Sequence, residues 1–367
     1  HQMFGIATTI ARLRSPELRD SELLGKDGFA VDSTIVPEES VTRYIQLLID
    51  YPEALQVVRF SQGVAYLARV RVAASSNLTG HTIAEFAEQN PDVPVRIVAV
   101  YRKDALLPSE ASTRVRSGDE VFVLADKERL RTVLRAIGNP DRRVNRVMIV
   151  GGGRVGLRLA RSLIGDCEVK IFEINPERCE YLAANLPRNM LVLQGDGSDE
   201  ELLLLENVGD TDLFIALTSD DEDNILSAML AKRMGARRVI ALVNRRAYAE
   251  LLHGSAVDIA ISPSQAVIGE LLMHVRRGAI AGVHSLRQGV AEALEGIAFG
   301  DAKTSSLVGR RLDQLKLPEG VRVGAIVRGV AAEAHIVLPQ DDTVVAADDH
   351  VILFVPQKQL MRAVEKL

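Results

Sequence analysis

The chain has 367 residues, 47% of them hydrophobic and 25% charged, which suits about two or three globular domains. Its net charge of −5 excludes a general binder of nucleic-acid backbones, and its 4% aromatic content without Trp excludes a base-stacking platform. The apolar runs are shorter than the roughly 18 residues that a membrane span needs. Two cysteines, Cys167 and Cys179, give neither a disulfide framework nor zinc-ligand spacing. Composition therefore excludes secreted, integral-membrane and zinc-ribbon proteins.

The chain repeats itself. It opens without Met and passes at once into a strand-like stretch at residues 9–13, so we expect it to start inside a domain, at the end of a helix. Four segments then recur in the same order at an offset of 226 to 230 residues (258 − 32 and 240 − 10). They are residues 8–12 with 238–242, 30–37 with 256–263, 78–81 with 307–310, and 117–124 with 347–354. This pattern predicts a tandem duplication whose first copy is incomplete.

The first part of each repeat has the pattern of an α/β fold. In the second copy apolar strands alternate with segments whose apolar residues follow helical spacing. The predicted strands are 146–150, 169–173, 190–194, 212–218 and 238–243, and the helices between them are 155–163, 176–185, 198–206 and 221–234. Such alternation indicates βαβ units, so we predict a Rossmann-like domain with a parallel sheet.

The second part of each repeat is shorter and richer in strands. The predicted strands are 296–299, 322–328, 343–345 and 350–355, with helices at 311–315 and 358–367. This mixture predicts a small α+β module. A polar linker at residues 138–143 and the end of a helix around residues 276–278 are the expected boundaries.

A glycine-rich turn follows the strand at 146–150. Gly151, Gly153 and Gly156 form the pattern G-x-G-x-x-G at the point where a strand gives way to a helix. In that setting the first glycine allows a tight turn, the second lets a diphosphate approach the backbone, and the third lets the helix pack on the strand. Glu173 ends the next strand, where an acid accepts hydrogen bonds from ribose hydroxyls and repels a 2′-phosphate. The pattern predicts a dinucleotide site; the alternative is a glycine turn that merely packs.

The residues of the turn, Gly151, Gly152, Gly153, Arg154 and Val155, are thus the predicted contacts of the phosphates. They lie between the predicted strand and the N-terminus of the predicted helix, whose N–H donors have no partner within the helix.

Two further loops follow strands that should end at the same edge of the sheet. Asp196 and Gly197 follow the third strand, where Asp196 either accepts a hydrogen bond from an adenine amino group or is a turn residue before a helix capped by Ser198. Thr218 and Ser219 follow the fourth strand, and we predict that they contact the nucleotide. The acids at 220–223 we interpret as carboxylates that complement the dipole of the next helix.

No catalytic group accompanies this site. Neither cysteine has the neighbours of a nucleophile, and no pair of histidines has metal-ligand spacing. A dehydrogenase needs a proton donor near the nicotinamide, whereas a sensor needs only a site and a conformational response. We therefore predict a regulator with neither catalytic nor metal-ligand residues; the alternative is an NAD-dependent oxidoreductase.

The duplication and four short motifs resemble the RCK (KTN) regulators of potassium transport, in their tandem form. The motifs are Gly-Gly-Gly-Arg-Val-Gly at 151–156, Gly-Asp-Gly-Ser at 195–198, Thr-Ser-Asp-Asp-Glu at 218–222 and Ala-Ile-Ser-Pro at 260–263. The resemblance implies NAD(H) as ligand, with ATP or ADP as alternatives at the same kind of site. It also implies assembly as a dimer or tetrameric ring under a TrkH- or TrkG-type potassium transporter, at the cytoplasmic face of the inner membrane.

The resemblance also implies a division into domains. It gives a C-terminal remnant of a first RCK-N domain at 1–45, a first RCK-C domain at 57–141, a second RCK-N domain at 145–263, a connecting helix at 264–281 and a second RCK-C domain at 282–367. About 90 residues of the first RCK-N domain are then missing. Arg12 is the predicted surviving edge of that domain's nucleotide site, where a guanidinium can hold a diphosphate; the alternative is a solvated arginine. Leu242 takes its place in the second copy.

Overall fold

The computed structural model describes residues 8–14, 18–19, 21–25, 28–91, 96–137, 143–252, 255–275, 280–330 and 333–364. The chain forms two compact units, which we call the nucleotide unit (residues 1–50 and 143–267) and the strand-rich unit (residues 51–142 and 268–367). The first residues of the chain, most of the predicted linker and the predicted helix end at 276–278 lie outside the described residues. No described helix has the length and apolar character that crossing a bilayer requires.

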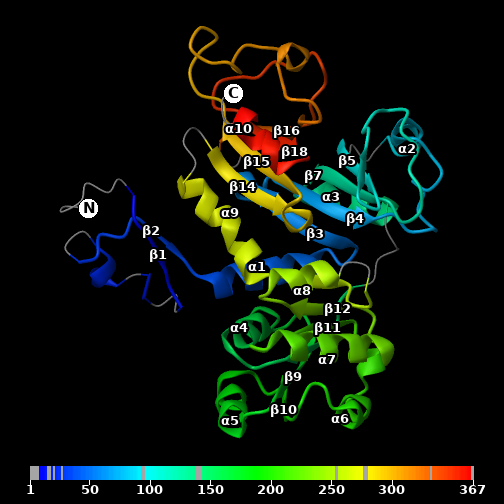
Figure 1. Ribbon diagram of the computed structural model, residues 1–367, viewed down its shortest axis with the longest axis vertical. Coiled ribbons are helices and arrows are strands. Elements are labelled where there is room, and N and C mark those ends of the chain that lie inside the picture. Colours follow the sequence, from blue (N-terminus) through cyan, green and yellow to red (C-terminus); the bar gives the residue numbers. More distant parts are fainter. Residues whose placement is uncertain are drawn as a thin grey trace. The chain divides into compact units, whose positions relative to one another are not determined.

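The nucleotide unit contains a six-stranded parallel sheet, and Figure 1 labels its strands β9, β10, β11 and β12. Its strands lie in the order β10-β9-β8-β11-β12-β13. Their bounds are β8 Arg146–Val150, β9 Glu168–Glu173, β10 Leu191–Gln194, β11 Leu213–Ala216, β12 Val239–Leu242 and β13 Ile259–Ile261. The order reverses between β8 and β11, which is where open parallel sheets bind ligands, beyond the carboxyl ends of their strands. This confirms the predicted Rossmann-like parallel sheet.

Helices connect these strands. They are α4 Arg154–Ser162, α5 Pro176–Asn185, α6 Glu200–Leu205, α7 Asp221–Arg233 and α8 Arg246–Leu251. Two expectations were wrong in detail. The strand at 239–242 does not end the series, because β13 adds a sixth strand, and Asp199 rather than Ser198 caps α6, accepting hydrogen bonds from the backbone of Glu201 and Leu202.

Both faces of this sheet are buried. Successive side chains of a strand point to opposite faces, so Ile149 belongs to one apolar cluster and Met148 to another. Strands covered on both sides need apolar residues at nearly every position, which is why the β8 and β11 sequences show no alternation.

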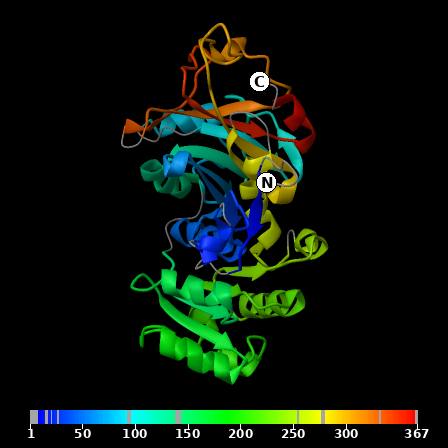
Figure 2. The same ribbon diagram turned by 90° about the vertical axis from the view of Figure 1, so that its left-hand side faces the viewer.

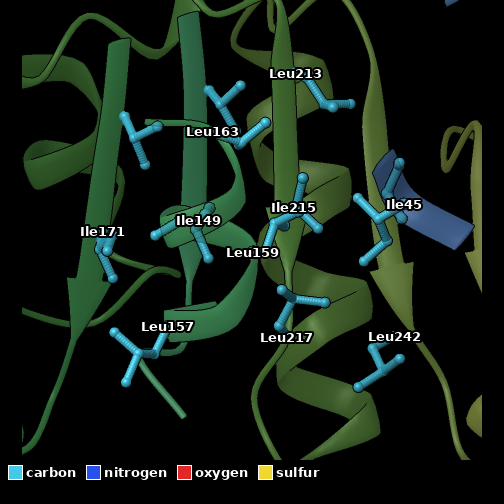
Figure 3. Packing of buried hydrophobic residues seen from close by; sticks show 14 of the residues in the cluster. Ile45, Ile149, Leu157, Leu159, Leu163, Ile171, Leu213, Ile215, Leu217 and Leu242 are labelled. Carbon is cyan, nitrogen blue, oxygen red and sulfur yellow. The ribbon is translucent and has the colours of Figure 1, made fainter. Parts of the chain in front are cut away.

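One face is completed by a helix from the first repeat. Helix α1 (Pro37–Asp50) follows the two-stranded parallel pair β1 (Ile10–Arg12) and β2 (Ser33–Ile35) and packs against α4. Its residues Val41, Ile45 and Leu48 are buried in the same cluster as the side chains of β8 and β11. Figure 3 shows Ile45 reaching from α1, drawn in blue, toward the sheet.

The strand-rich unit consists of two five-stranded antiparallel sheets of the same topology (Figures 1 and 2). The first has the order β3-β4-β7-β5-β6 and the second β14-β15-β18-β16-β17. The bounds are β3 Ala54–Phe60, β4 Ala65–Arg71, β5 Arg96–Arg102, β6 Ala105–Leu107 and β7 Glu120–Asp126, then β14 Ile280–Leu286, β15 Ala291–Ile297, β16 Arg322–Arg328, β17 His335–Val337 and β18 His350–Val355. The helices are α2 Ile83–Gln89, α3 Lys127–Ile137 and α10 Met361–Val364, while α9 (Pro263–Val275) runs from one unit into the other.

The duplication is confirmed down to single side chains. Arg102 makes two hydrogen bonds to Asp119 at 2.9 and 2.8 Å, and Arg328 makes the same two to Asp349 at the same distances. Both sheets contribute to one buried cluster, in which the rings of Phe122 and Phe354 lie 5.4 Å apart.

Several predicted elements of the second module were wrong. The strand expected at 296–299 is the end of β15, and β14 and β17 were missed. The helix expected at 311–315 is a 3₁₀ turn, Leu312–Gln314, and residues 343–345 form only an isolated bridge between Arg311 and Val344. The last predicted helix is a 3₁₀ turn, Lys358–Leu360, followed by the four residues of α10; residues 365–367 lie outside the described part.

Candidate nucleotide site

The glycine turn (residues 151–156) joins β8 to α4 and includes the first three residues of that helix, as the motif predicted. Gly151 has a φ of +100°, and a Cβ there would lie 2.9 Å from the backbone carbon of Leu217. A Cβ on Gly156 would lie 2.1 Å from the carbonyl oxygen of Gly151. Only glycine therefore lets the turn close on itself and rest on the loop after β11.

The middle of the turn is open. A Cβ on Gly153 would meet nothing within 4 Å. Gly153 is also the N-cap of α4, with no side-chain hydrogen bond to the helix, so the first N–H groups of α4 keep their capacity to bind an anion. This combination of space and donors suits a diphosphate.

Charged side chains hold the Gly152 backbone from both sides. Glu173, at the end of β9, accepts a hydrogen bond from the Gly152 N–H at 2.8 Å and another from the Asn175 N–H at 3.0 Å. Arg178, in the first turn of α5, donates through Nε to the Gly152 carbonyl at 2.7 Å. The guanidinium of Arg178 lies 4.6 Å from the ring centroid of Tyr181. Sequence reasoning missed Arg178, because helical position alone does not show that it reaches back to the turn.

Glu173 is half-buried, and two of the roughly four acceptor positions of its carboxylate are used by these backbone bonds. The remaining acceptor capacity fits ribose hydroxyls. Its contact with ribose stays a prediction.

The loop after β11, residues 217–220, lies beside the turn, and we call it the switch-point loop. Thr218 and Ser219 belong to it, and both are at the carboxyl end of the strand next to β8. The Thr218 hydroxyl accepts from the Asp220 N–H at 3.2 Å, which closes a small turn. Asn224, in α7, bonds to both the N–H and the carbonyl of Thr218. Sequence reasoning missed Asn224, since it followed a run of acids that was interpreted by charge alone.

That interpretation was incomplete. Asp220 caps α7, accepting from the Asp223 N–H at 2.9 Å, in keeping with a helix-terminus role. Asp221 instead turns inward, is buried, and accepts hydrogen bonds from the N–H groups of Asn244 and Arg245, each at 2.8 Å. Burial alone would raise the pKa of Asp221, but these bonds outweigh it and hold the pKa below its usual value. Asp221 therefore fixes the loop after β12.

Asp196 has the contacts of a turn residue. Its carboxylate accepts from the N–H and the hydroxyl of Ser198, both at 2.8 Å. A Cβ on Gly197 would clash with Val150 at 2.3 Å, so glycine is needed there for the loop to cross the end of β8. The adenine contact of Asp196 stays a prediction.

Three predicted residues have contacts of another kind. Arg154, at the start of α4, lies 3.6 Å from a carboxylate oxygen of Glu38 on α1. Arg12 belongs to the separate two-stranded sheet, opposite Ile35, and is not part of the six-stranded sheet that carries the glycine turn. Val155 is half-buried against the apolar cluster beneath the turn. Their roles toward a ligand stay predictions.

Neither cysteine is prepared for nucleophilic chemistry. Burial raises the pKa of Cys167 to about 11, and burial also raises the pKa of Cys179. Thiolate, the reactive form, is therefore scarce at neutral pH at both positions.

Comparison with known proteins identifies the family of this chain. The TrkA-N domain matches residues 147–263, and the TrkA-C domain matches residues 67–138 and 301–367. The chain is 43% identical to the Trk system potassium uptake protein TrkA of Vibrio alginolyticus and 44% identical to that of Halomonas elongata. Each match covers 100% of this chain and 79% of the relative.

Solved structures share the fold. The crystal structure of the GsuK RCK domain matches with a TM-score of 0.52 and 18% identity, over 98% of this chain and 74% of that one. A structure described as the GsuK channel bound to NAD matches with a TM-score of 0.51 and 17% identity, over 98% and 62%. From the two domain matches and the identity to its full-length relatives, the chain belongs to the TrkA family of Trk system potassium uptake proteins.

Proposed function

We propose that this chain is the nucleotide-sensing regulatory subunit of a Trk-type potassium uptake system, and that it binds NAD(H) at the glycine turn. The observation that carries the proposal is the open backbone at Gly153, at the uncapped N-terminus of α4, with the Glu173 carboxylate held beside it. The family of the relatives and the NAD in the GsuK channel structure support it.

The residues present fit such a ligand. The N–H groups at the start of α4 favour the negative charge of a diphosphate, and Gly153 leaves it room. Glu173 accepts from ribose hydroxyls and repels a 2′-phosphate, which favours NAD(H) over its phosphorylated form. ATP and ADP carry the same adenosine and phosphate groups, so we propose them as alternative ligands.

Regulation requires that the two conformational states of an assembly bind the nucleotide with different affinities. We propose that the chain assembles as a homo-oligomer, a dimer or tetrameric ring, on a TrkH- or TrkG-type transporter at the cytoplasmic face of the inner membrane. A coupling free energy of about 1–3 kcal/mol between the nucleotide site and the transporter's gate changes gating about 5- to 150-fold.

The first prediction tests the regulation itself. In vesicles that contain the transporter and this chain joined to the N-terminal segment of its relatives, NADH or ATP is expected to change potassium flux by about 5- to 150-fold. The Gly153→Ala variant, which fills the space at the turn, is the matched control and should abolish the response. Flux that ignores every nucleotide, together with turnover of NADH by the protein alone, would instead support an NAD-dependent oxidoreductase.

The second prediction concerns Glu173. Glu173→Ala is expected to weaken NADH binding by about 1–3 kcal/mol, the usual loss for a charged hydrogen-bond partner. Isothermal titration of the purified chain with NAD⁺, NADH, ATP and ADP measures this and ranks the ligands. Glu177→Ala, on the exposed first turn of α5, is the control and should bind as the parent does. Equal affinity of the Glu173→Ala variant and the parent chain would show that the ribose assignment is wrong.

A further inference from the structure

Asn224 is fully buried in the first turns of α7, with an exposed fraction of 0%. Its carboxamide oxygen accepts from the Thr218 N–H at 2.8 Å. Its amide nitrogen donates to the Thr218 carbonyl at 3.1 Å and to the Leu242 carbonyl at 2.9 Å. The two N–H donors and the oxygen all have partners, so this buried side chain has a single favourable orientation.

These bonds join the ends of two neighbouring strands. Thr218 follows β11, and Leu242 is the last residue of β12. Because Asn224 bonds to both backbone groups of Thr218, it fixes the peptide groups on either side of that residue. One side chain thereby sets the position of the switch-point loop relative to β12.

The same loop supports the glycine turn. The backbone of Leu217 and Thr218 is what a Cβ on Gly151 would strike, at 2.9 to 3.0 Å. Leu217 also donates its N–H to the carbonyl of Val150 at 2.7 Å. A displacement of the Leu217–Thr218 peptide therefore changes the support of the turn as well as the place of Thr218 and Ser219.

We propose that Asn224 is a positioning residue of the nucleotide site, which holds the switch-point loop and, through it, the glycine turn in the arrangement that binds nucleotide. This rests on the proposed function. The inference requires an amide: aspartate keeps the acceptor for the Thr218 N–H but has no donor for the two carbonyls when ionised.

Asn224→Asp is the test, with Ser227→Ala as its matched control. Ser227 lies one turn further along α7 and is 1% exposed. Among the described residues its hydroxyl bonds to the helix carbonyls of Asp223 and Asn224 and not to the switch-point loop, so its loss perturbs the helix without touching that loop. At pH 8 Asn224→Asp is expected to weaken NADH binding by at least about tenfold. The ionised carboxylate has no hydrogen to donate, so it leaves the carbonyls of Thr218 and Leu242 without the hydrogen bonds that the amide of Asn224 makes. Ser227→Ala should bind NADH within about twofold of the parent.

Lowering the pH provides a readout that a merely structural role does not give. Burial and the two carbonyl oxygens that face it favour the protonated form of the introduced carboxyl group, and once protonated it donates one hydrogen bond again as the pH is lowered toward 6. The ratio of variant to parent affinity should then recover by several-fold, about half of the loss in free energy. Amide hydrogen exchange of the free protein is the second measurement: protection of residues 217–219 and 150–153 should fall in Asn224→Asp at pH 8 and stay unchanged in Ser227→Ala.

The outcomes separate the two proposals. A parent chain that binds none of NADH, NAD⁺, ATP and ADP overturns the proposed function and this inference with it. Parent binding with unchanged affinity of the Asn224→Asp variant, or an equal loss in Ser227→Ala, overturns only the positioning role of Asn224. A loss of affinity in Asn224→Asp with unchanged amide protection of residues 217–219 and 150–153 overturns it too, because the switch-point loop is then not displaced.

Discussion

Gly156→Ala is expected to destabilise the nucleotide unit by about 3 kcal/mol, at the upper end of the usual range for overpacking, and to abolish nucleotide binding. The added methyl group would lie 2.1 Å from the carbonyl oxygen of Gly151 and 3.6 Å from a methyl group of Ile149. The nearer of these is backbone, which cannot rotate aside. Helix α4 must therefore move away from β8, and its N-terminus moves with it away from the proposed site of the phosphates.

Gly153→Ala fills the open space at the turn without disturbing the packing of α4 on β8. Its methyl group would meet no protein atom within 4 Å, and the backbone at Gly153 is extended. We expect a loss of stability below about 1 kcal/mol, since alanine is a poorer N-cap than glycine, together with a loss of NADH affinity. Urea unfolding measures the first quantity and titration with NADH the second. Equal destabilisation by the two substitutions would mean that α4 does not pack on the turn as described.

The parallel sheet was predictable because its signals are local. Strands β8 and β11 are buried on both faces, so their sequences are almost continuously apolar, and Gly151 and Gly156 meet steric demands that no other residue meets. Pro176 at the start of α5 marks that helix without knowledge of its surroundings.

The residues that hold the site together were not predictable in the same way. Asp221 and Asn224 stand in a run of polar residues where composition suggests a solvated helix start, yet both are buried and bond to backbone groups that lie 18 to 24 positions further along the chain. Arg178 likewise reaches a carbonyl 26 positions earlier. Their partners are decided by the tertiary arrangement of strand ends, which helical periodicity does not encode.

The strand-rich modules were harder still. Strand β14 includes Gly282 and His284, and β15 includes Gly296 and two glutamates, so neither has the alternation that marks a half-buried strand. Both are strands because their neighbours in the sheet pair with them. The duplication was nevertheless visible, because equivalent positions keep similar residues whatever element they form.

The packing of α1 in the nucleotide unit joins residues about 100 or more positions apart in the chain, so sequence patterns do not reveal it. Ile45→Ala is expected to destabilise that unit by about 2–5 kcal/mol, the range for removing an isoleucine from a packed core. Ile45 is 0% exposed and lies in the cluster formed by β8, β11 and α4 (Figure 3). Removing its side chain leaves a cavity that the strands beneath it cannot close.

Ion pairs at the start of α1 add to this contact. Arg158 of α4 lies 2.7 Å from Glu39, which is also paired with Arg19 at 2.6 Å. Burial alone would raise the pKa of Glu39, but the two arginines outweigh it and hold the pKa below its usual value. These partly exposed pairs orient α1, whereas the apolar face supplies most of the free energy.

Amide hydrogen exchange can locate the loss. In Ile45→Ala the free energy of opening of the slowest-exchanging amides in β8 and β11 should fall by about 2–5 kcal/mol, the whole of the predicted destabilisation. The free energy of opening of the amides in β4 and β7 should stay unchanged, because the two units bury separate apolar clusters. Gln46→Ala is the control, because Gln46 is the next residue on α1 and its side chain is half-buried rather than buried. It should change the free energy of opening of neither set of amides by more than about 0.5 kcal/mol. An Ile45→Ala variant with normal exchange in β8 and β11 would show that α1 is not part of their core. The predicted loss would instead show that a helix of the first repeat stabilises the sheet on which the second repeat carries the candidate nucleotide site.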